Sequence, residues 1–125
     1  MIRVGIVDDE ILAREVLEEY CSKINNFELI LSTGNPLEFI NFMQQNDLDL
    51  VFLDIEMPEL NGMEILRSMI RPPKVILTTA YSEFALESYN YGVVDYLLKP
   101  IKIEWFLKAI NKVTASKMTD SKQRS

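Results

Sequence analysis

The sequence predicts an α/β fold in which a doubly wound, five-stranded parallel sheet is covered by helices on both faces. Short runs rich in β-branched residues alternate with stretches whose apolar residues recur at helical spacing, as expected of a parallel sheet wrapped by helices. The strand-like runs are apolar throughout, so they suit burial on both faces. With 125 residues, of which 48% are hydrophobic, the chain has the size of one globular domain.

The strand-like runs define five βα units. Strands are predicted over residues 2–7, 27–32, 50–53, 74–78 and 95–98. In the common order 2-1-3-4-5, which is the flavodoxin-like arrangement, right-handed connections leave a ligand crevice between strands 1 and 3. Five helices are expected to flank this sheet.

The first two connections carry the apolar spacing of amphipathic helices. In the first, the residues at that spacing are Leu12, Val16, Leu17, Tyr20 and Ile24. The second is expected to begin after Asn35, whose side chain can cap a helix, with Pro36 in the first turn. Its expected core face includes Leu37, Ile40 and Met43.

The later connections are also expected to be helical. A third helix follows Asn61 and Gly62 and ends before Pro72, because a residue that precedes proline avoids the helical conformation. Its core face is expected to hold Met63, Leu66 and Ile70. A fourth helix is expected over about 82–91, and a fifth carries Phe106, Leu107, Ile110 and Val113. The folded domain is therefore expected over 1–113, with 114–125 as a flexible tail or the start of a linker because they lack an apolar period.

Composition excludes several kinds of function. The net charge of −6 and the pI near 4.7 disfavour direct nucleic-acid binding, which depends on clustered Lys and Arg. With no His and only Cys21, the chain cannot build a His- or Cys-based metal centre, a Ser-His pair or an intrachain disulfide. The apolar stretch at 4–7 is cut short by acids and no run reaches membrane-spanning length, so we expect a cytoplasmic domain without a membrane segment.

Three carboxylates follow strand-like runs that the predicted topology makes neighbours. Asp8 and Asp9 follow VGIV, and Asp54 follows LVFL. Together at one sheet edge they would repel one another unless one stays protonated or a cation holds them, and Mg²⁺ suits a site made of oxygen ligands. Each acid alone could equally be a turn residue at a strand end. The presence of all three acids at the predicted crevice favours a cation site.

Two more strand ends supply groups that phosphate chemistry would use. Strand 4 ends near Thr79 and strand 5 runs into Lys99. Asp54 could attack a phosphoryl donor while the Thr79 hydroxyl and the Lys99 ammonium contact the phosphoryl oxygens. In isolation, Thr79 would be an ordinary strand residue and Lys99 an ordinary solvated lysine. Their coincidence with the acids favours the functional interpretation.

These residues resemble the receiver domains of bacterial two-component response regulators. The resemblance spans roughly 2–113, and its motifs are VDDE at 7–10, LDIEMPELNG at 53–62, TTA at 78–80 and DYLLKP at 95–100. The pattern around Tyr81, Phe84 and Ala85 is most similar to receivers joined to a LytTR-type DNA-binding domain, which these 125 residues do not include. The chain is therefore expected to be an excised or a stand-alone receiver.

The resemblance implies a role for each site residue. It implies that Asp54 is the phosphoacceptor and that Lys99 contacts the phosphoryl group. It implies that Asp8, Asp9 and Asp54 ligate Mg²⁺ together with the backbone carbonyl of Glu56. The cofactor is then Mg²⁺ and the phosphoryl donor a histidine kinase.

The resemblance also implies a conformational switch. Thr79 is then the switch hydroxyl and Tyr96 the switch aromatic, and the Lys99–Pro100 bond is expected to be cis. Phosphorylation would change the surface formed by helix 4, strand 5 and helix 5, where a phosphorylation-dependent homodimer could form. Such a domain is a signalling switch that assists its own phosphorylation and dephosphorylation, and is not otherwise an enzyme.

Two alternatives from other classes stay open. A Mg²⁺-dependent aspartyl phosphatase would place a second acid two residues after its nucleophile, and Glu56 stands at that spacing from Asp54. The small chain offers no inserted cap to enclose a substrate, which argues against a phosphatase. A phosphorylation-independent pseudo-receiver would normally lack one of the acids or the lysine, and all of them are present here.

Overall fold

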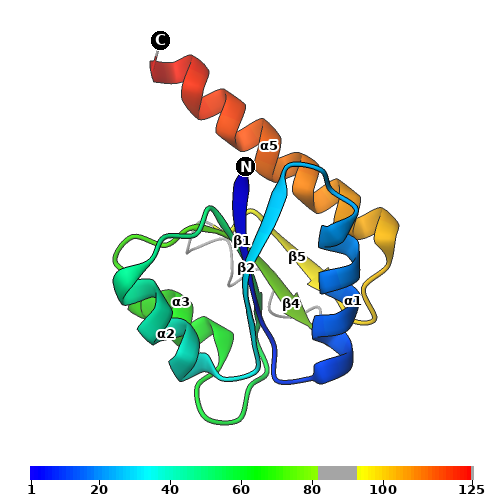
Figure 1. Ribbon diagram of the computed structural model, residues 1–125, viewed down its shortest axis with the longest axis vertical. Coiled ribbons are helices and arrows are strands. Elements are labelled where there is room, and N and C mark those ends of the chain that lie inside the picture. Colours follow the sequence, from blue (N-terminus) through cyan, green and yellow to red (C-terminus); the bar gives the residue numbers. More distant parts are fainter. Residues whose placement is uncertain (82–92, 125) are drawn as a thin grey trace.

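The computed structural model describes residues 1–81 and 93–124, and the side chains within 1–81 and 93–115. Its centre is a parallel sheet in the order β2-β1-β3-β4-β5 (Figure 1). The strands are β1 (Ile2–Val7), β2 (Phe27–Thr33), β3 (Leu50–Asp54), β4 (Lys74–Thr79) and β5 (Asp95–Leu98). The predicted α/β class and strand order are confirmed.

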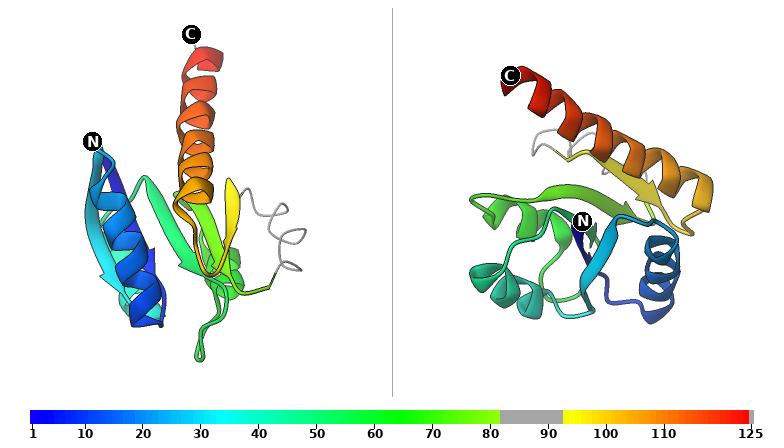
Figure 2. Two further views of the ribbon diagram at one scale, coloured as in Figure 1. Left: turned by 90° about the vertical axis from the view of Figure 1, so that its right-hand side faces the viewer. Right: turned by 45° about the horizontal axis from the view of Figure 1, so that its top comes forward.

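Helices cover both faces of the sheet (Figures 1 and 2). They are α1 (Ile11–Ser22), α2 (Pro36–Gln45), α3 (Gly62–Ser68) and α5 (Ile103–Arg124). Helices α1 and α5 pack on one face, where Leu17 and Phe106 join one apolar cluster. Helices α2 and α3 pack on the other, where Phe39 and Ile65 join a second cluster. The helix expected at 82–91 lies outside the described residues.

Local sequence signals explain where the helices on the second face begin. The side chain of Asn35 accepts a hydrogen bond from the amide of Leu37, and Pro36 occupies the first turn of α2, as predicted. At the start of α3, Asn61 and Glu64 form a reciprocal capping box. These caps satisfy amides that a helix end leaves without partners.

Several residues expected in the core are exposed. Ile70 is 95% exposed, because α3 ends at Ser68 and Ile70 no longer lies on a helical face. Leu12, Leu37 and Leu107 are also exposed, while Cys21, Phe39 and Ala109 fill the corresponding core positions. Helical spacing alone leaves the direction of the apolar face uncertain by about one residue, and packing against the sheet decides it.

The residues after the expected end of the domain continue the last helix. Helix α5 continues past Val113 to Arg124, and Figure 1 shows its distal half extending beyond the sheet. Residues 114–124 contain neither Pro nor Gly, so no strong stop signal ends the helix. Among the described residues, none of the helices has the length and apolar character that would let it cross a membrane.

Candidate functional site

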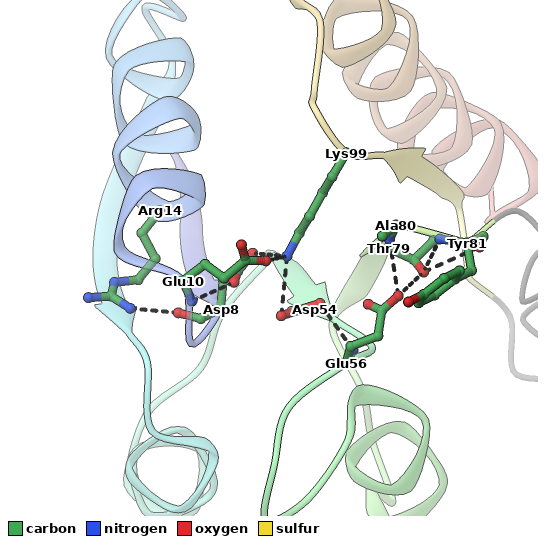
Figure 3. A network of polar contacts seen from close by, with 9 residues as sticks. All are labelled: Asp8, Glu10, Arg14, Asp54, Glu56, Thr79, Ala80, Tyr81 and Lys99. Carbon is green, nitrogen blue, oxygen red and sulfur yellow. Dashed lines mark hydrogen bonds and ion pairs between the residues drawn. The ribbon is translucent and has the colours of Figure 1, made fainter.

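The ends of four neighbouring strands bring polar side chains to one edge of the sheet. Asp8 follows β1, Asp54 ends β3, Thr79 ends β4 and Lys99 follows β5. Because all the strands are parallel, their carboxyl ends meet at the same edge. Figure 3 shows Lys99 reaching from the end of β5 toward the two aspartates.

Lys99 connects the acids at this edge. Its Nζ lies 3.0 Å from Oδ2 of Asp8, 3.3 Å from Oδ2 of Asp54 and 2.6 Å from Oε1 of Glu10. The two aspartates are fully buried, whereas the side chain of Glu10 is largely exposed. One ammonium thus faces three carboxylates, so its single positive charge does not neutralise the two buried aspartates.

Burial sets the proton affinities of these groups. It raises the pKa of Asp54 to about 9, with the charge of Asp8 adding to the rise and the charge of Lys99 opposing it. For Lys99, burial lowers the pKa, but hydrogen bonds to Glu10 and Asp8 outweigh that effect and raise it above its ordinary value. Lys99 therefore stays protonated at neutral pH, whereas ionisation of Asp54 is unfavourable in free energy.

The arrangement fits a hard divalent cation. Carboxylate oxygens of Asp8, Glu10 and Asp54 lie within 4.8 Å of one another. Oδ2 of Asp8 and Oδ2 of Asp54 are buried, and both face the same Lys99 ammonium, at 3.0 and 3.3 Å. Two buried carboxylates that share one ammonium are costly to ionise unless a further cation compensates their charge. These oxygens have the chemistry of ligands for Mg²⁺.

Asp9 differs from its neighbours. Its side chain is exposed and, together with Glu56 and Asn61, lines an open pocket of about 520 Å³ beside the buried acids. The structure thus gathers Glu10 with Asp8 and Asp54, and it places Asp9, which the sequence analysis expected as a ligand, in the lining of the adjoining pocket. Glu10 stands in the VDDE motif, so its type and position were visible in the sequence.

Backbone contacts hold the two buried aspartates in place. Arg14 donates from Nη1 to the backbone oxygen of Asp8 at 2.6 Å, a contact that sequence reasoning missed because nothing local marks it. The amide of Glu56 donates to Oδ1 of Asp54 at 3.1 Å. A Cβ on Gly62 would lie 2.3 Å from the backbone oxygen of Asp54, so only glycine allows α3 to begin this close to β3.

The end of β4 binds the side chain of Glu56. Oε1 of Glu56 accepts a short hydrogen bond from the Thr79 hydroxyl and another from the amide of Ala80 at 3.0 Å (Figure 3). Burial raises the pKa of Glu56, but hydrogen bonds from Thr79 and Ala80, together with the neighbouring Asp54 carboxyl, outweigh this and lower it below the ordinary value. Glu56 is therefore ionised at neutral pH.

The residues that the resemblance assigned to the switch lie on β4 and β5. Thr79 is fully buried. Tyr96 is half-buried, pairs with Leu77 across the two strands and packs against the apolar cluster under α2 and α3. The Lys99–Pro100 peptide bond is cis.

Comparison with known proteins identifies the family. The family model described as the response regulator receiver domain matches residues 4–111. The chain belongs to this family. An uncharacterized response regulatory protein of Yersinia pestis is 40% identical to this receiver domain over 117 residues, which are 91% of this chain and 49% of that protein.

Other relatives agree with this assignment. The transcriptional regulatory protein LytR of Staphylococcus aureus is 34% identical over 123 residues, covering 96% of this chain and 50% of LytR. The receiver domain thus spans about half the length of these curated relatives.

Solved structures of receivers have the same fold. The response regulatory domain of protein mrkE from Klebsiella pneumoniae superposes with a TM-score of 0.84 at 30% identity, covering 92% of this chain and 97% of that one. Response regulator TrrA of Thermotoga maritima, solved in complex with Mg²⁺-BeF, gives a TM-score of 0.77 at 30% identity, with coverage of 90% and 99%. This receiver domain is therefore a signalling domain of a two-component system.

Proposed function

We propose that this receiver domain takes a phosphoryl group from a histidine kinase onto Asp54 and passes the signal on through a change of its surface. The observation that carries the proposal is the position of Asp54. Its carboxylate is fully buried at the carboxyl edge of the sheet, 3.3 Å from the Lys99 ammonium and close to the carboxylate of Asp8, which the same ammonium contacts. An acid with this setting suits nucleophilic attack on phosphorus.

The proposed step breaks one bond to phosphorus and forms another. A carboxylate oxygen of Asp54 attacks the phosphorus of a phosphohistidine, the phosphorus–nitrogen bond breaks, and the leaving imidazole nitrogen keeps the electron pair and later takes a proton. The Lys99 ammonium already faces Asp54 and would contact one phosphoryl oxygen. Its raised pKa keeps it charged throughout.

Mg²⁺ is the proposed cofactor. Asp8, Asp9 and Asp54 would hold it together with the backbone carbonyl of Glu56, and the close approach of Glu10 adds a further candidate ligand. When bound, the cation would neutralise negative charge on the acids and on the phosphoryl oxygens. The neighbour TrrA was solved with Mg²⁺-BeF, which supports this assignment by similarity.

The output is proposed to involve helix 4, β5 and α5. If the Thr79 hydroxyl moves toward a phosphoryl oxygen, Tyr96 can turn into the space that Thr79 leaves, and this biases a two-state surface. The half-buried position of Tyr96 on β5 is compatible with such a turn. A phosphorylation-dependent homodimer on this surface is proposed as well.

The similarity to LytR and the half-length coverage of the relatives support a longer parent protein. We propose that a LytTR-type DNA-binding domain follows α5 there. The acidic receiver would then regulate DNA binding without contacting nucleic acid itself.

The phosphatase alternative is disfavoured by Glu56. A proton donor must carry a proton at the working pH. The lowered pKa of Glu56 keeps it ionised, and its Oε1 accepts hydrogen bonds from Thr79 and Ala80. The pseudo-receiver alternative is disfavoured because Asp8, Asp54 and Lys99 are present and in contact.

Intact-mass measurement after incubation with acetyl phosphate and Mg²⁺ tests the proposal. We expect the mass of one phosphoryl group to be added to the wild-type domain, to be lost on chelation of Mg²⁺ before the reaction, and to be absent in Asp54→Asn. Full labelling of Asp54→Asn together with loss of labelling in Asp9→Asn would show that the nucleophile is assigned wrongly. Steady release of phosphate from small phosphate esters would instead support the phosphatase.

A further inference from the structure

Two hydrogen-bond donors at the end of β4 converge on a single carboxylate oxygen. The Thr79 hydroxyl and the Ala80 amide both donate to Oε1 of Glu56. Thr79 is fully buried, and its own oxygen accepts a hydrogen bond from the amide of Tyr81 at 3.0 Å. The donors of Thr79 and Ala80, called the donor pair below, are thus fixed in position and suited to an oxygen that carries negative charge.

The donor pair lies beside the proposed nucleophile. Asp54 pairs in register with Thr78, the residue before the donor pair. Figure 3 shows the Glu56 carboxylate in the space between Asp54 and the end of β4. The backbone amide of Glu56 donates to Oδ1 of Asp54. Glu56 therefore contacts the nucleophile through its backbone and the donor pair through its side chain.

The Glu56 side chain is only partly satisfied in this position. Its second oxygen, Oε2, is buried and accepts no hydrogen bond from the described residues. Leaving a buried charged oxygen unpaired weakens the contact. An anion that uses more of its oxygens, such as a phosphoryl group on Asp54, can therefore displace Glu56 from the donor pair.

We propose that Glu56 is an internal anion that occupies the donor pair of the unphosphorylated domain and must leave before a phosphoryl oxygen binds there. This contact, called the Glu56 latch, rests on the proposed phosphorylation of Asp54 for its role. Both anions need the same donors, so only molecules with an open latch bind a phosphoryl group fully. The apparent affinity for a phosphoryl mimic is reduced by the fraction of open molecules.

Two substitutions separate the latch from simple charge repulsion. Glu56→Asp keeps the negative charge, but its side chain is one methylene shorter and cannot reach the donor pair from the same backbone position. Glu56→Gln removes the charge but keeps the length and an oxygen that accepts hydrogen bonds. Glu59→Gln removes a charge from an exposed position in the same loop and serves as the matched control.

The first measurement is titration of each variant with beryllofluoride in the presence of Mg²⁺, with Asp54→Asn as the blank. We expect Glu56→Asp to bind roughly tenfold more tightly than the wild type, and Glu56→Gln and Glu59→Gln to stay within about threefold of it. The opposite ranking, with Glu56→Gln tight and Glu56→Asp unchanged, would overturn the latch in favour of charge repulsion.

The second measurement needs neither Mg²⁺ nor a phosphoryl mimic. Amide hydrogen exchange at Ala80 should be slow in the wild type and Glu56→Gln, and on the order of tenfold faster in Glu56→Asp, because its amide loses its acceptor. Equal exchange rates in all three proteins would overturn the latch.

If exchange follows the expected order but no variant binds beryllofluoride, the latch contact stands and the proposed phosphorylation fails. If wild type binds through Asp54 and all Glu56 variants bind equally, the phosphorylation stands and the latch fails.

Discussion

Replacing Asp54 with Asn should stabilise the metal-free domain at neutral pH. Burial, with the charge of Asp8, raises the pKa of Asp54 from 3.8 to about 9. An acid whose pKa is higher in the folded state takes up a proton on folding at pH values between the two. Its contribution to stability is therefore most favourable below pH 3.8 and falls as the pH rises toward 9. Asn cannot ionise, so the variant lacks this cost.

The size of the effect follows from the two pKa values. Each pH unit above 3.8 costs about 1.36 kcal/mol, which gives about 4 kcal/mol at pH 7 and about 2 kcal/mol at pH 5. Relaxation around a buried charge reduces such costs, so we expect Asp54→Asn to gain about 2 kcal/mol at pH 7 and about half of that at pH 5. At roughly 3–5 °C per kcal/mol, Tm should rise by about 6–10 °C at pH 7.

Urea and thermal unfolding in the presence of a chelator measure this difference at pH 5, 7 and 8.5. The control is Glu59→Gln, which removes an exposed carboxylate from the loop after β3. It should change the free energy of unfolding by less than about 0.5 kcal/mol. A variant that is less stable than the wild type at pH 7 would refute the reasoning. So would a stability gap that is the same at pH 5 and pH 7, because then ionisation of Asp54 is not its source.

Three further outcomes are expected. Millimolar Mg²⁺ should raise the Tm of the wild type but not of Asp9→Ala, since a ligand that binds only the folded state stabilises it by mass action; a Tm insensitive to Mg²⁺ in both would count against the site. The half-life of the phosphorylated domain should be shorter in Glu56→Asn and Tyr81→Ala than in the wild type, because the charge of Glu56 and the bulk of Tyr81 keep attacking water away from the phosphorus. A clearly longer half-life in Glu56→Asn would mean that Glu56 activates the water as a base. Gly62→Ala should lose roughly 2 kcal/mol or more in urea unfolding, because its Cβ would lie 2.3 Å from the backbone oxygen of Asp54, and an unchanged midpoint would show that α3 moves freely.

The strands and the central acid of the site could be predicted because their signals are local. The run at 50–53 is apolar at every position and ends in Asp54, a pattern that favours a strand buried on both faces. Once the sheet is parallel, Asp54 and Lys99 must lie at the same edge, since each stands at the carboxyl end of a strand. The cap at Asn35 was predictable for the same reason, because its hydrogen bond reaches only two residues along the chain.

Other features depended on how side chains pack around the sheet edge. Asp8 and Asp9 are adjacent and alike, yet only the packing around the sheet edge decides that Asp8 is buried and Asp9 exposed. No sequence pattern predicted the contact of Arg14 with the Asp8 carbonyl six residues before it, or the contact of Glu56 with Thr79 23 residues after it.

The sequence by itself thus determined the fold class and the edge at which the chemistry lies, because periodicity and strand ends are properties of short segments, and the strand order followed from the common arrangement of such units. Only the tertiary structure decided which site oxygens are buried, that Glu10 joins Asp8 and Asp54, and that Glu56 accepts hydrogen bonds from Thr79 and Ala80. The physical reason is that the direction and solvation of a loop side chain are set by the surfaces packed around it, which folding brings together from the whole chain.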